Sequence, residues 1–395
     1  MAITLVAIAA LAATGAFAQS SVVIDGYFDR AYTVVNNTDN TKDAKSVGSN
    51  AGTTTIGIKV REDLGNGLSV GGSVNTDWND LGGASQTATY ANAQRSGFAN
   101  SQSFLDVTSA KYGTVRLGTP NSFTLTNATA VAAPAFSTAI GSSYSSNFSI
   151  ANGVGTSATD QIGVASASEA ADAKAHAGIR SIRINNTLQY SSPVFSGFSG
   201  HLSYTPKNDN QTTSTKSGNT VGVKEFALRY TQGPIDAMYS SIKYSTGENN
   251  VVTYNMSTTN PTAGTSTTIG ANLTSTQNLL GATYAVLPAL KLHAGLGQFK
   301  SSNDSFKGKS SQIGATYTMG QWDVLGQVAK VTDQVATSAY DRSLKGMGVN
   351  YNFSKTARAY FRADRINYAT GGNAATTGFA GDAQTRYALG VSKSF

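Results

Sequence analysis

The residues best suited to chemistry in this sequence are basic side chains that alternate with apolar ones. Lys59 and Arg61, for example, alternate with Ile58 and Val60. A period of two residues is typical of a β-strand, whose successive side chains point to opposite faces. The cations of such a strand share one face, and rings of Lys and Arg around a water-filled space favour anions. The pattern therefore predicts reversible attraction of anions rather than bond making or breaking.

The same alternation recurs in sixteen segments, which are predicted to be strands of an all-β fold. An even number of antiparallel strands is typical of a transmembrane β-barrel of the bacterial outer membrane. The predicted strands are 22–34, 53–62, 68–78, 103–111, 113–119, 182–191, 197–205, 222–232, 234–245, 276–286, 289–300, 310–319, 321–332, 344–353, 356–368 and 384–395.

The connections alternate strictly between tight turns and long polar segments. Many tight turns contain Gly or Pro, as at Gly233-Pro234 and Leu287-Pro288. In an outer-membrane barrel the short turns are periplasmic and the long loops are external. A soluble β-sandwich gives no reason for this alternation. The predicted external loops are 35–52, 79–102, 120–181, 206–221, 246–275, 301–309, 333–343 and 369–383.

The N-terminal segment and the composition agree with export to a membrane. An apolar run from Ile3 to Leu11 precedes Ala16-Phe17-Ala18, so a signal peptide over 1–18 and a single barrel domain over 19–395 are predicted. No later apolar run reaches the ~18–20 residues that a transmembrane helix requires. Charged residues make up 13% of the chain, whereas a soluble domain has about 25%.

Strand parity assigns the charged residues to the interior of the barrel, because a Lys or Arg facing lipid costs about 2–4 kcal/mol near the midplane. Arg61, Arg116 and Arg183 are the first choices for a basic wall, since their strands surround the attachment of segment 120–181. The other basic residues assigned inward are Lys59, Arg229, Lys243, Lys291, Arg358, Arg362 and Arg386. Fewer acids are expected to face inward, namely Asp25, Asp29, Asp106 and Asp364. Tyr residues near strand ends, Tyr244 among them, are expected to face lipid as an aromatic girdle.

Segment 120–181 is much longer than the other connections and contains Phe123, Phe136, Tyr144 and Phe148. These apolar side chains need packing partners, so the segment is predicted to fold inward against the barrel wall and to narrow the lumen. Its acidic residues would then lie opposite the basic wall and create a transverse field. The acids expected at this constriction are Asp160, Glu169 and Asp172.

Eight stretches, taken together in their order and spacing, resemble a known family. They are SSVVIDGYFDRAYTVVNN from Ser20, EDLGNGLSVGGSV from Glu62, KYGTVRLGTPNS from Lys111, INNTLQYSSPVFSGFSG from Ile184, LLGATYAV from Leu279, QIGATYTMG from Gln312, GMGVNYNFSKTARAYFRADRI from Gly346 and YALGVSKSF from Tyr387. In these stretches, which cover most of the chain after residue 18, the protein resembles the trimeric, sixteen-stranded general porins of Gram-negative bacteria, of the betaproteobacterial type.

The resemblance implies a homotrimer embedded in outer-membrane lipid and lipopolysaccharide. It also implies that the third external loop forms the constriction and that the second lies over a neighbouring subunit. The chain departs from the family pattern at Thr119, where an Arg is common, and at Asn75 and Asp77, near which a Glu is common. The acidic Pro-Glu-Phe-Gly stretch of the third loop is absent. These departures affect the charge pattern of the constriction rather than the fold.

Other chemistries find little support in the sequence. The chain has no Cys, and His176, His201 and His293 have no second ligand at metal spacing, so neither a metal site nor a cofactor is expected. Gly197-Phe198-Ser199-Gly200 departs from the G-x-S-x-G nucleophile motif by one position. Nucleic-acid binding is not expected, because the basic and aromatic residues fall on opposite strand faces.

The sequence thus predicts a non-enzymatic channel of the outer membrane that passes small hydrophilic solutes and ions by passive diffusion, with some preference for anions. Two alternatives remain open. A substrate-specific channel for one solute class would have a binding site along the lumen. An adhesin or a rim enzyme on a barrel scaffold would carry its function at the external end. His201 is the only candidate catalytic residue for such an enzyme.

Overall fold

The computed structural model describes residues 20–37, 44–78, 88–90, 93–95, 99, 101–137, 140–144, 148, 183–184, 186–206, 221–246, 251–257, 260–269, 274–302, 307–334, 341–368 and 383–395. Within them, a seventeen-stranded antiparallel sheet consists of sixteen barrel strands and the short strand β2 (Ala44–Gly48). The barrel strands are β1 (Ser20–Asn37), β3 (Thr54–Gly65), β4 (Leu68–Trp78), β7 (Ser103–Ser109), β8 (Gly113–Thr119), β9 (Thr187–Ser191), β10 (Phe198–Thr205), β11 (Val221–Gln232), β12 (Ile235–Thr246), β15 (Thr274–Leu287), β16 (Leu290–Ser301), β17 (Lys307–Met319), β18 (Trp322–Asp333), β19 (Arg342–Asn352), β20 (Ala357–Tyr368) and β21 (Ala383–Ser394).

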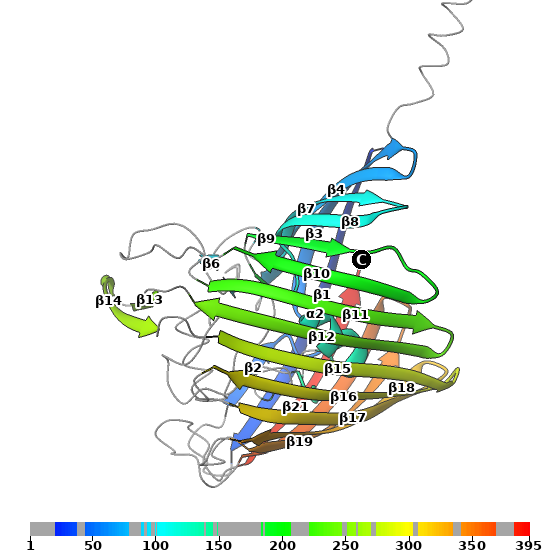
Figure 1. Cartoon of the computed structure of the whole chain (residues 1–395). Coiled ribbons are helices and arrows are strands. Elements are labelled where there is room, and N and C mark those ends of the chain that lie inside the picture. The colour runs from blue at the N-terminus through cyan, green and yellow to red at the C-terminus, as the bar shows by residue number, and fades with distance from the viewer. Residues whose placement is uncertain are drawn as a thin grey trace, which may run out of the picture.

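The sheet closes into a barrel through its first strand (Figure 1). The N-terminal part of β1 pairs with β3, from Ser20↔Glu62 to Tyr27↔Thr55. The remainder of β1 pairs with β21, from Tyr27↔Ser394 to Asn37↔Gln384. Closure satisfies the backbone groups that would otherwise be unpaired at two sheet edges, which is a requirement in lipid. The predicted antiparallel barrel of sixteen strands is confirmed.

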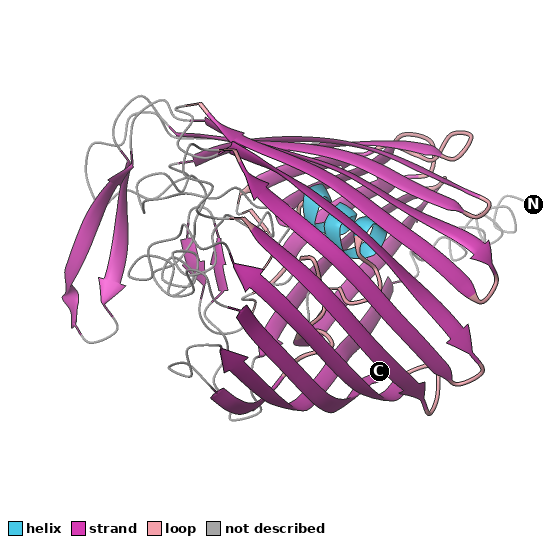
Figure 2. Ribbon diagram, turned by 90° about the horizontal axis from the view of Figure 1, so that it is seen from below, coloured by secondary structure: helices cyan, strands magenta, loops and turns pink. Residues whose placement is uncertain are grey.

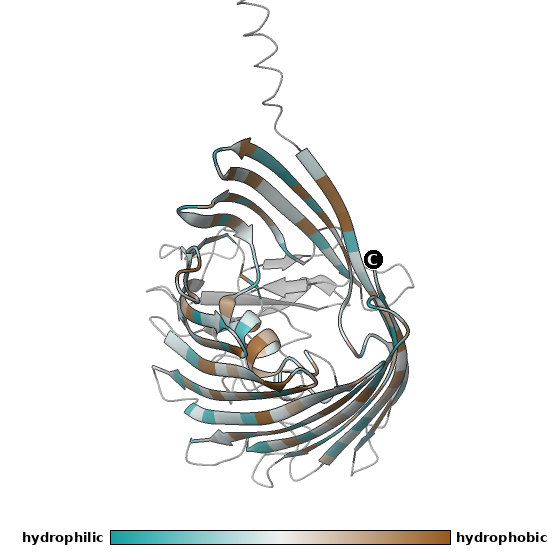
Figure 3. Cartoon of the chain, turned by 90° about the vertical axis from the view of Figure 1, so that its right-hand side faces the viewer, coloured by the Kyte–Doolittle hydropathy of each residue, from teal (hydrophilic) through white to brown (hydrophobic). Residues whose placement is uncertain are grey.

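The two faces of the strands differ as period-two alternation requires (Figure 3). Most outward side chains are apolar and exposed, with Leu105, Leu296 and Leu389 each about 60% accessible or more. Inward positions include buried polar side chains such as Gln277 and Gln312. The described residues contain no helix that is long and apolar enough to cross a membrane.

The tight turns between consecutive strands lie together at one end of the barrel (Figure 2). The turn between β3 and β4 is one of the tight ones. Its residues Gly65, Asn66 and Gly67 all adopt positive φ, from 54° to 82°, a conformation that Gly and Asn tolerate best. Three segments predicted as loops contain additional strands, which is a correction: β2 pairs with β1, and two separate hairpins are formed by β5 (Ala88–Tyr90) with β6 (Ala93–Arg95) and by β13 (Val251–Ser257) with β14 (Asn260–Ile269).

Two parity assignments differ from the sequence prediction, and one predicted strand is much shorter than expected. On β12 the inward residues are Ile242 and Tyr244, which are 0% and 2% exposed, and Lys243 faces outward. This inversion arises because Ile242 and Tyr244 pack with Ile184 and Val223 in an apolar cluster on the inner face of the barrel. The predicted strand 182–191 is shorter than expected, because β9 begins at Thr187 and Arg183 forms an isolated bridge with Asn121.

The wall of the barrel is uneven in height. Strands β7, β8, β9 and β10 have 7, 7, 5 and 8 residues, whereas β15 and β17 have 14 and 13. A transmembrane strand tilted by about 45° needs roughly 9–11 residues to cross the hydrocarbon layer. The strands of the short wall, β7 to β10, are shorter than this, and single backbone pairings extend their ladder, between Asn75 and Gln102 and between Asn121 and Arg183.

Candidate functional site

Two of the predicted arginines share one buried carboxylate on the short wall. Arg61 donates from Nη2 to Asp106 Oδ1 at 3.0 Å, and Arg116 Nη2 lies 3.7 Å from Asp106 Oδ2. The Asp106 side chain is 5% exposed, but the side chains of Arg61 and Arg116 are 47% and 32% exposed. The Arg116 guanidinium also stacks 4.0 Å from the ring centroid of Phe104. Two cations around one anion leave a net positive charge at the accessible surface.

A glycine between the paired strands permits this arrangement. Arg61 lies opposite Gly71 on β4, and Gly71 lies opposite Asp106 on β7. A Cβ at Gly71 would lie 3.1 Å from Asp106 Oδ1 and 3.2 Å from Arg61 Nη2, which is tighter than nearly all real contacts. The absence of a side chain therefore allows the guanidinium to cross β4 and reach the carboxylate.

The strand register places this cluster on the interior face. The row that contains Arg61 and Arg116 continues through Gln189 and Ser203 to Glu225 on β11. Both Gln189 and Glu225 bond to residues 121–124, which run inside the barrel (Figure 2). The predicted inward parity of Arg61 and Arg116 agrees with this register.

The beginning of segment 120–181 forms a short helix against β11. This helix, α2 (Phe123–Thr126), is capped by Ser122, whose Oγ accepts from Leu125 N at 3.0 Å. The carboxylate of Glu225 accepts from Phe123 N at 3.1 Å and from Thr124 N at 2.7 Å. A buried carboxylate thus satisfies two backbone donors that the first turn of a helix leaves without intrahelical partners.

The next turns of this segment cross β12, β15 and β16. They form the π-helix η1 (Asn127–Ala132). Asn127 Nδ2 donates to the carbonyl oxygens of Met238 and Leu279 at 2.9 Å and 2.8 Å. Thr283 on β15 donates to Val131 O at 2.7 Å. These bonds hold η1 against the inner surface of the barrel.

The segment then reaches the wall on the opposite side, at β19 and β20. Gly141 N donates to Asp364 at 2.7 Å, and Arg342 Nε donates to Phe148 O at 2.7 Å. An apolar cluster fills the space between segment and wall. Its buried members are Leu125, Ala128, Ala132, Tyr144, Phe148, Leu279, Phe299, Ala329, Val331, Leu344 and Ile366.

Two predicted channel residues are covered by this segment, which corrects their assignment as lining residues. Arg362 is 2% exposed, donates to Asn350 Oδ1 at 2.6 Å and lies 5.7 Å from the ring centroid of Phe136. Arg386 is 7% exposed and makes a bidentate pair with Asp364 at 2.9 and 2.5 Å. Both face inward as predicted, but they support the segment instead of contacting open water.

The remaining described candidates are paired on the inner wall. Arg183 donates to Asn121 at 2.9 Å and to Asp77 at 3.1 Å. Arg229 forms a bidentate pair with Asp236 at 2.8 and 2.6 Å. Lys59 pairs with Asp25. The predicted Asp160, Glu169 and Asp172 lie outside the described residues.

Acidic residues on the interior face are more numerous than the sequence analysis expected. Asp77, Glu225, Asp236 and Asp323 are among the acids that join the four predicted ones there. Parity could have identified Glu225, because it shares a strand face with the predicted Arg229. The accessible surface is nevertheless basic, since in each pair the cation is the more exposed partner: 19% against 9% for Arg183 and Asp77, and 31% against 23% for Arg229 and Asp236.

Comparison with known families identifies this architecture. A family model of Gram-negative porins matches residues 4–388, which is nearly the whole chain. The chain belongs to the Gram-negative porins. This porin is accordingly a channel protein of the outer membrane, and its barrel and polar interior are those of a passive diffusion channel. Among its described residues no group of three or more His, Cys, Asp or Glu could hold a metal ion.

Solved structures of other porins share the fold of this porin. An anion-selective porin from Comamonas acidovorans is 20% identical and superimposes with a TM-score of 0.65 over 95% of this chain and 100% of its own. OmpT of Vibrio cholerae in its trimer form is 14% identical, with a TM-score of 0.60 over 95% and 99%. OmpF of Salmonella typhi, solved with daunomycin, is 13% identical, with a TM-score of 0.53 over 96% and 98%. No curated protein sequence matches.

Proposed function

We propose that this porin is a general diffusion channel with a preference for small anions. The observation that carries the proposal is the exposure of Arg61 and Arg116 in front of the buried carboxylate of Asp106. Because the Asp106 carboxylate is buried behind the two guanidinium groups, Arg61 and Arg116 present positive charge to the lumen. Such a site attracts an anion but, being open to water, releases it again. The likeness to an anion-selective porin is consistent with this preference.

The constriction of the proposed channel is segment 120–181. In its described part, α2 and η1 lie against β11, β12, β15 and β16, and Gly141 and Phe148 contact β20 and β19. The described part of the segment therefore occupies interior volume over one side of the barrel and leaves Arg61 on β3 and Arg116 on β8 accessible. Passing solutes would move between this segment and the basic wall.

The test of this function is the conductance of the purified mature protein in a planar bilayer. Under a KCl gradient we expect stepwise channels whose reversal potential lies on the chloride side. A reversal potential on the potassium side would contradict the anion preference while leaving the channel intact. An absence of channels from folded protein would contradict the channel itself.

The alternative functions have distinct outcomes. Saturable flux of one solute would favour a substrate-specific channel, whereas flux that falls smoothly with solute size supports the general one. A rim enzyme would depend on His201, whose ring contacts Ser191, Ser199 and Phe123. None of these three groups can orient a general base as a carboxylate does, so we propose no catalytic role.

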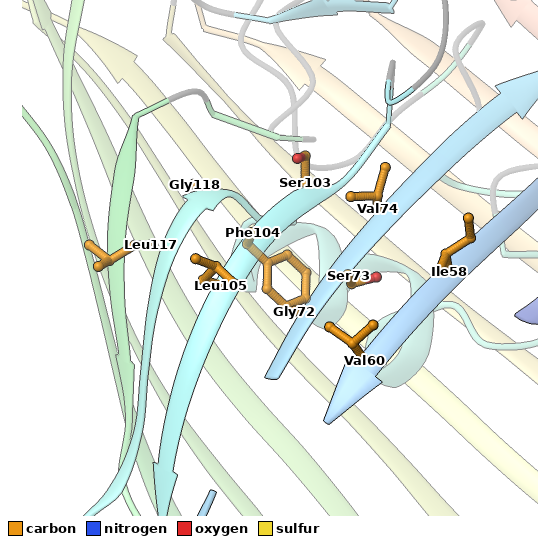
Figure 4. Close-up of a pocket in the computed structure, with 10 residues that line it drawn as sticks. All are labelled: Ile58, Val60, Gly72, Ser73, Val74, Ser103, Phe104, Leu105, Leu117 and Gly118. Atoms are coloured by element: carbon orange, nitrogen blue, oxygen red, sulfur yellow. The ribbon is translucent and has the colours of Figure 1, made fainter. Parts of the chain in front are cut away.

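The proposed assembly is a homotrimer in which the short wall contacts a second copy of the chain. This wall has the shortest described strands of the barrel, and its outward face carries exposed apolar side chains such as Leu105 and Leu117 that a partner can cover. Where this wall meets β3 and β4, the outward residues Leu105 and Leu117 of the wall and Ile58, Val60 and Val74 of β3 and β4 surround a hollow of 430 Å³ (Figure 4). This apolar hollow, which Gly72 also lines, can receive side chains of a neighbouring subunit.

Leu105→Trp tests the position of this contact. Leu105 is 63% exposed on β7 and Leu296 is 60% exposed on β16, so Leu296→Trp is a matched control. Because Trp is tolerated against lipid but would clash within a packed interface, we expect Leu105→Trp to convert trimers to monomers and Leu296→Trp to leave trimers intact. Mass photometry in detergent measures the outcome. Equal behaviour of the two variants would contradict the proposed contact.

A further inference from the structure

The carboxylate of Asp29 on β1 binds a short bend of the chain at the inner face of the barrel. Strands β2 and β3 both pair with β1, and residues 49–53, which join them, lie outside both ladders. We call residues 49–53 the inner bend. The successive backbone N–H groups of Asn50, Ala51 and Gly52 donate to Asp29 Oδ2 at 2.6, 2.6 and 3.1 Å. Successive N–H groups that converge in this way form an anion-binding concavity, and here a side chain of the same protein occupies it.

The other oxygen of this carboxylate is bound from β20, two strands away. Tyr360 donates from its hydroxyl to Asp29 Oδ1 at 2.6 Å. Its ring crosses β21 at Gly390, where a Cβ would lie 2.7 Å from Tyr360 Cζ. Asp29 and Tyr360 are 1% and 2% exposed. The four hydrogen bonds on this one buried carboxylate therefore tie β1 to β20 and to the inner bend.

Neighbouring side chains hold both ends of the inner bend. Arg30 Nη1 donates to Ser49 Oγ at 2.9 Å, at the start of the bend, and to Thr54 Oγ1 at 3.0 Å, just after its end. Asn50 Nδ2 donates to Thr33 Oγ1 at 2.5 Å. The bend is therefore bound to β1 along its length.

The inner bend contacts the far part of segment 120–181. Ala51 and Ile140 are 7% and 3% exposed and belong to one apolar cluster. Next to Ile140, Gly141 N donates to Asp364 on β20 at 2.7 Å. The other members of the cluster are Ala31, Tyr360 and Ala388. This part of the segment thus packs against β20 and the inner bend together.

We propose that Asp29 is a positioning residue of the channel and that the inner bend is a second element of its constriction. This inference rests on the proposed function in so far as segment 120–181 narrows the lumen. Glu225 binds the beginning of that segment, and the bend held by Asp29 packs against its far part. Without the Asp29 carboxylate, three neighbouring N–H groups and one hydroxyl lose their acceptor. Because buried donors without an acceptor are costly, the bend moves toward water and no longer supports Ile140.

Asp29→Ala tests this role by liposome swelling with uncharged sugars of increasing size. We expect a trisaccharide to enter several-fold faster through the variant than through wild type, because the far part of the segment is less firmly held. Sodium formate on both sides of the membrane should reverse most of this increase, since formate offers a carboxylate to the N–H groups of the inner bend. Sodium gluconate, whose anion is too large for the space of the lost side chain, should not reverse it.

Two further variants separate the bend from general effects on the barrel. Asp63→Ala is the matched control, because Asp63 Oδ1 also accepts from a backbone N–H, that of Gly65 at 2.9 Å, but in the exposed turn between β3 and β4. It should exclude the trisaccharide as wild type does, with and without formate. Ile140→Ala should admit the trisaccharide faster, and formate should not reverse this, because Asp29 still occupies the bend.

Wild-type sugar exclusion by Asp29→Ala would overturn the proposal. A faster entry that formate does not reverse would also overturn it, since general loosening of the barrel cannot respond to a small carboxylate. If Asp29→Ala does not fold, Asp29→Asn replaces it, because a neutral acceptor forms weaker hydrogen bonds than a carboxylate. Faster trisaccharide entry through Asp29→Asn then supports the proposal, and the wild-type rate contradicts it. A wild-type protein that forms no channels would refute the proposed function instead.

Discussion

Replacing Arg61, Arg116 and Arg183 with Gln is expected to lower the ratio of chloride to potassium permeability by about fivefold. That factor corresponds to ~1 kcal/mol, the interaction of two unit charges 4 Å apart in water. Arg61 and Arg116 both pair with Asp106, and Arg183 pairs with Asp77. Their loss removes exposed cations and also takes both arginine partners from the Asp106 carboxylate, so both changes favour potassium. The reversal potential under a KCl gradient measures the ratio.

The control for this variant is Lys111→Gln/Lys355→Gln/Lys393→Gln, which changes the net charge equally outside the basic wall. It should leave the permeability ratio close to that of wild type. If both triple variants shift the ratio to the same extent, selectivity depends on overall charge and not on the cluster around Asp106. An unchanged ratio in the arginine variant would remove these residues from the site.

Glu225→Ala is expected to release the beginning of segment 120–181 from the wall and to raise single-channel conductance. The Glu225 carboxylate accepts hydrogen bonds from Phe123 N and Thr124 N, and it is 3% exposed. Hydrogen bonds to a charged group contribute about 1.5–3 kcal/mol each. Without them, two buried N–H groups lack an acceptor, and α2 regains partners only by moving toward water. A wider and noisier channel should result, with a larger size limit for uncharged sugars in liposome swelling.

Glu225→Gln is the matched variant, because its side-chain carbonyl can still accept one of the two bonds. We expect its conductance to lie between those of wild type and Glu225→Ala. Asn127→Ala should act in the same direction as Glu225→Ala, since Asn127 holds η1 through Met238 O and Leu279 O. Wild-type conductance in both alanine variants would show that these anchors do not set the width of the channel.

The sequence predicted the strands well because a wall between lipid and water must alternate. Each of the sixteen predicted segments overlaps one barrel strand, and Arg61, Arg116 and Arg229 have the inward parity that their apolar neighbours indicated. The strand predicted at 234–245 is confirmed as β12, but the parity assigned to Lys243 and Tyr244 was wrong. Alternation assigns apolar residues to lipid, but Ile242 and Tyr244 are buried inside.

Alternation could not predict which inward-facing charged side chains remain accessible to solvent. Arg362 and Arg386 have the same inward parity as Arg61, yet they are almost completely covered. The covering residues are distant in sequence: Gly141 contacts Asp364 across 223 residues, and Phe148 contacts Arg342 across 194. Nothing in the local pattern of β20 or β21 indicates that another segment lies over it.

The sequence by itself determined the number of strands, the two-sided character of the wall and the membership in the porin family, because lipid on one side and water on the other impose a local period of two. Only the tertiary structure decided which inward cations remain accessible and which ones anchor segment 120–181. The physical reason is that accessibility depends on contacts between distant segments, such as Glu225 with the N-terminus of α2, whereas side-chain direction depends on the strand alone.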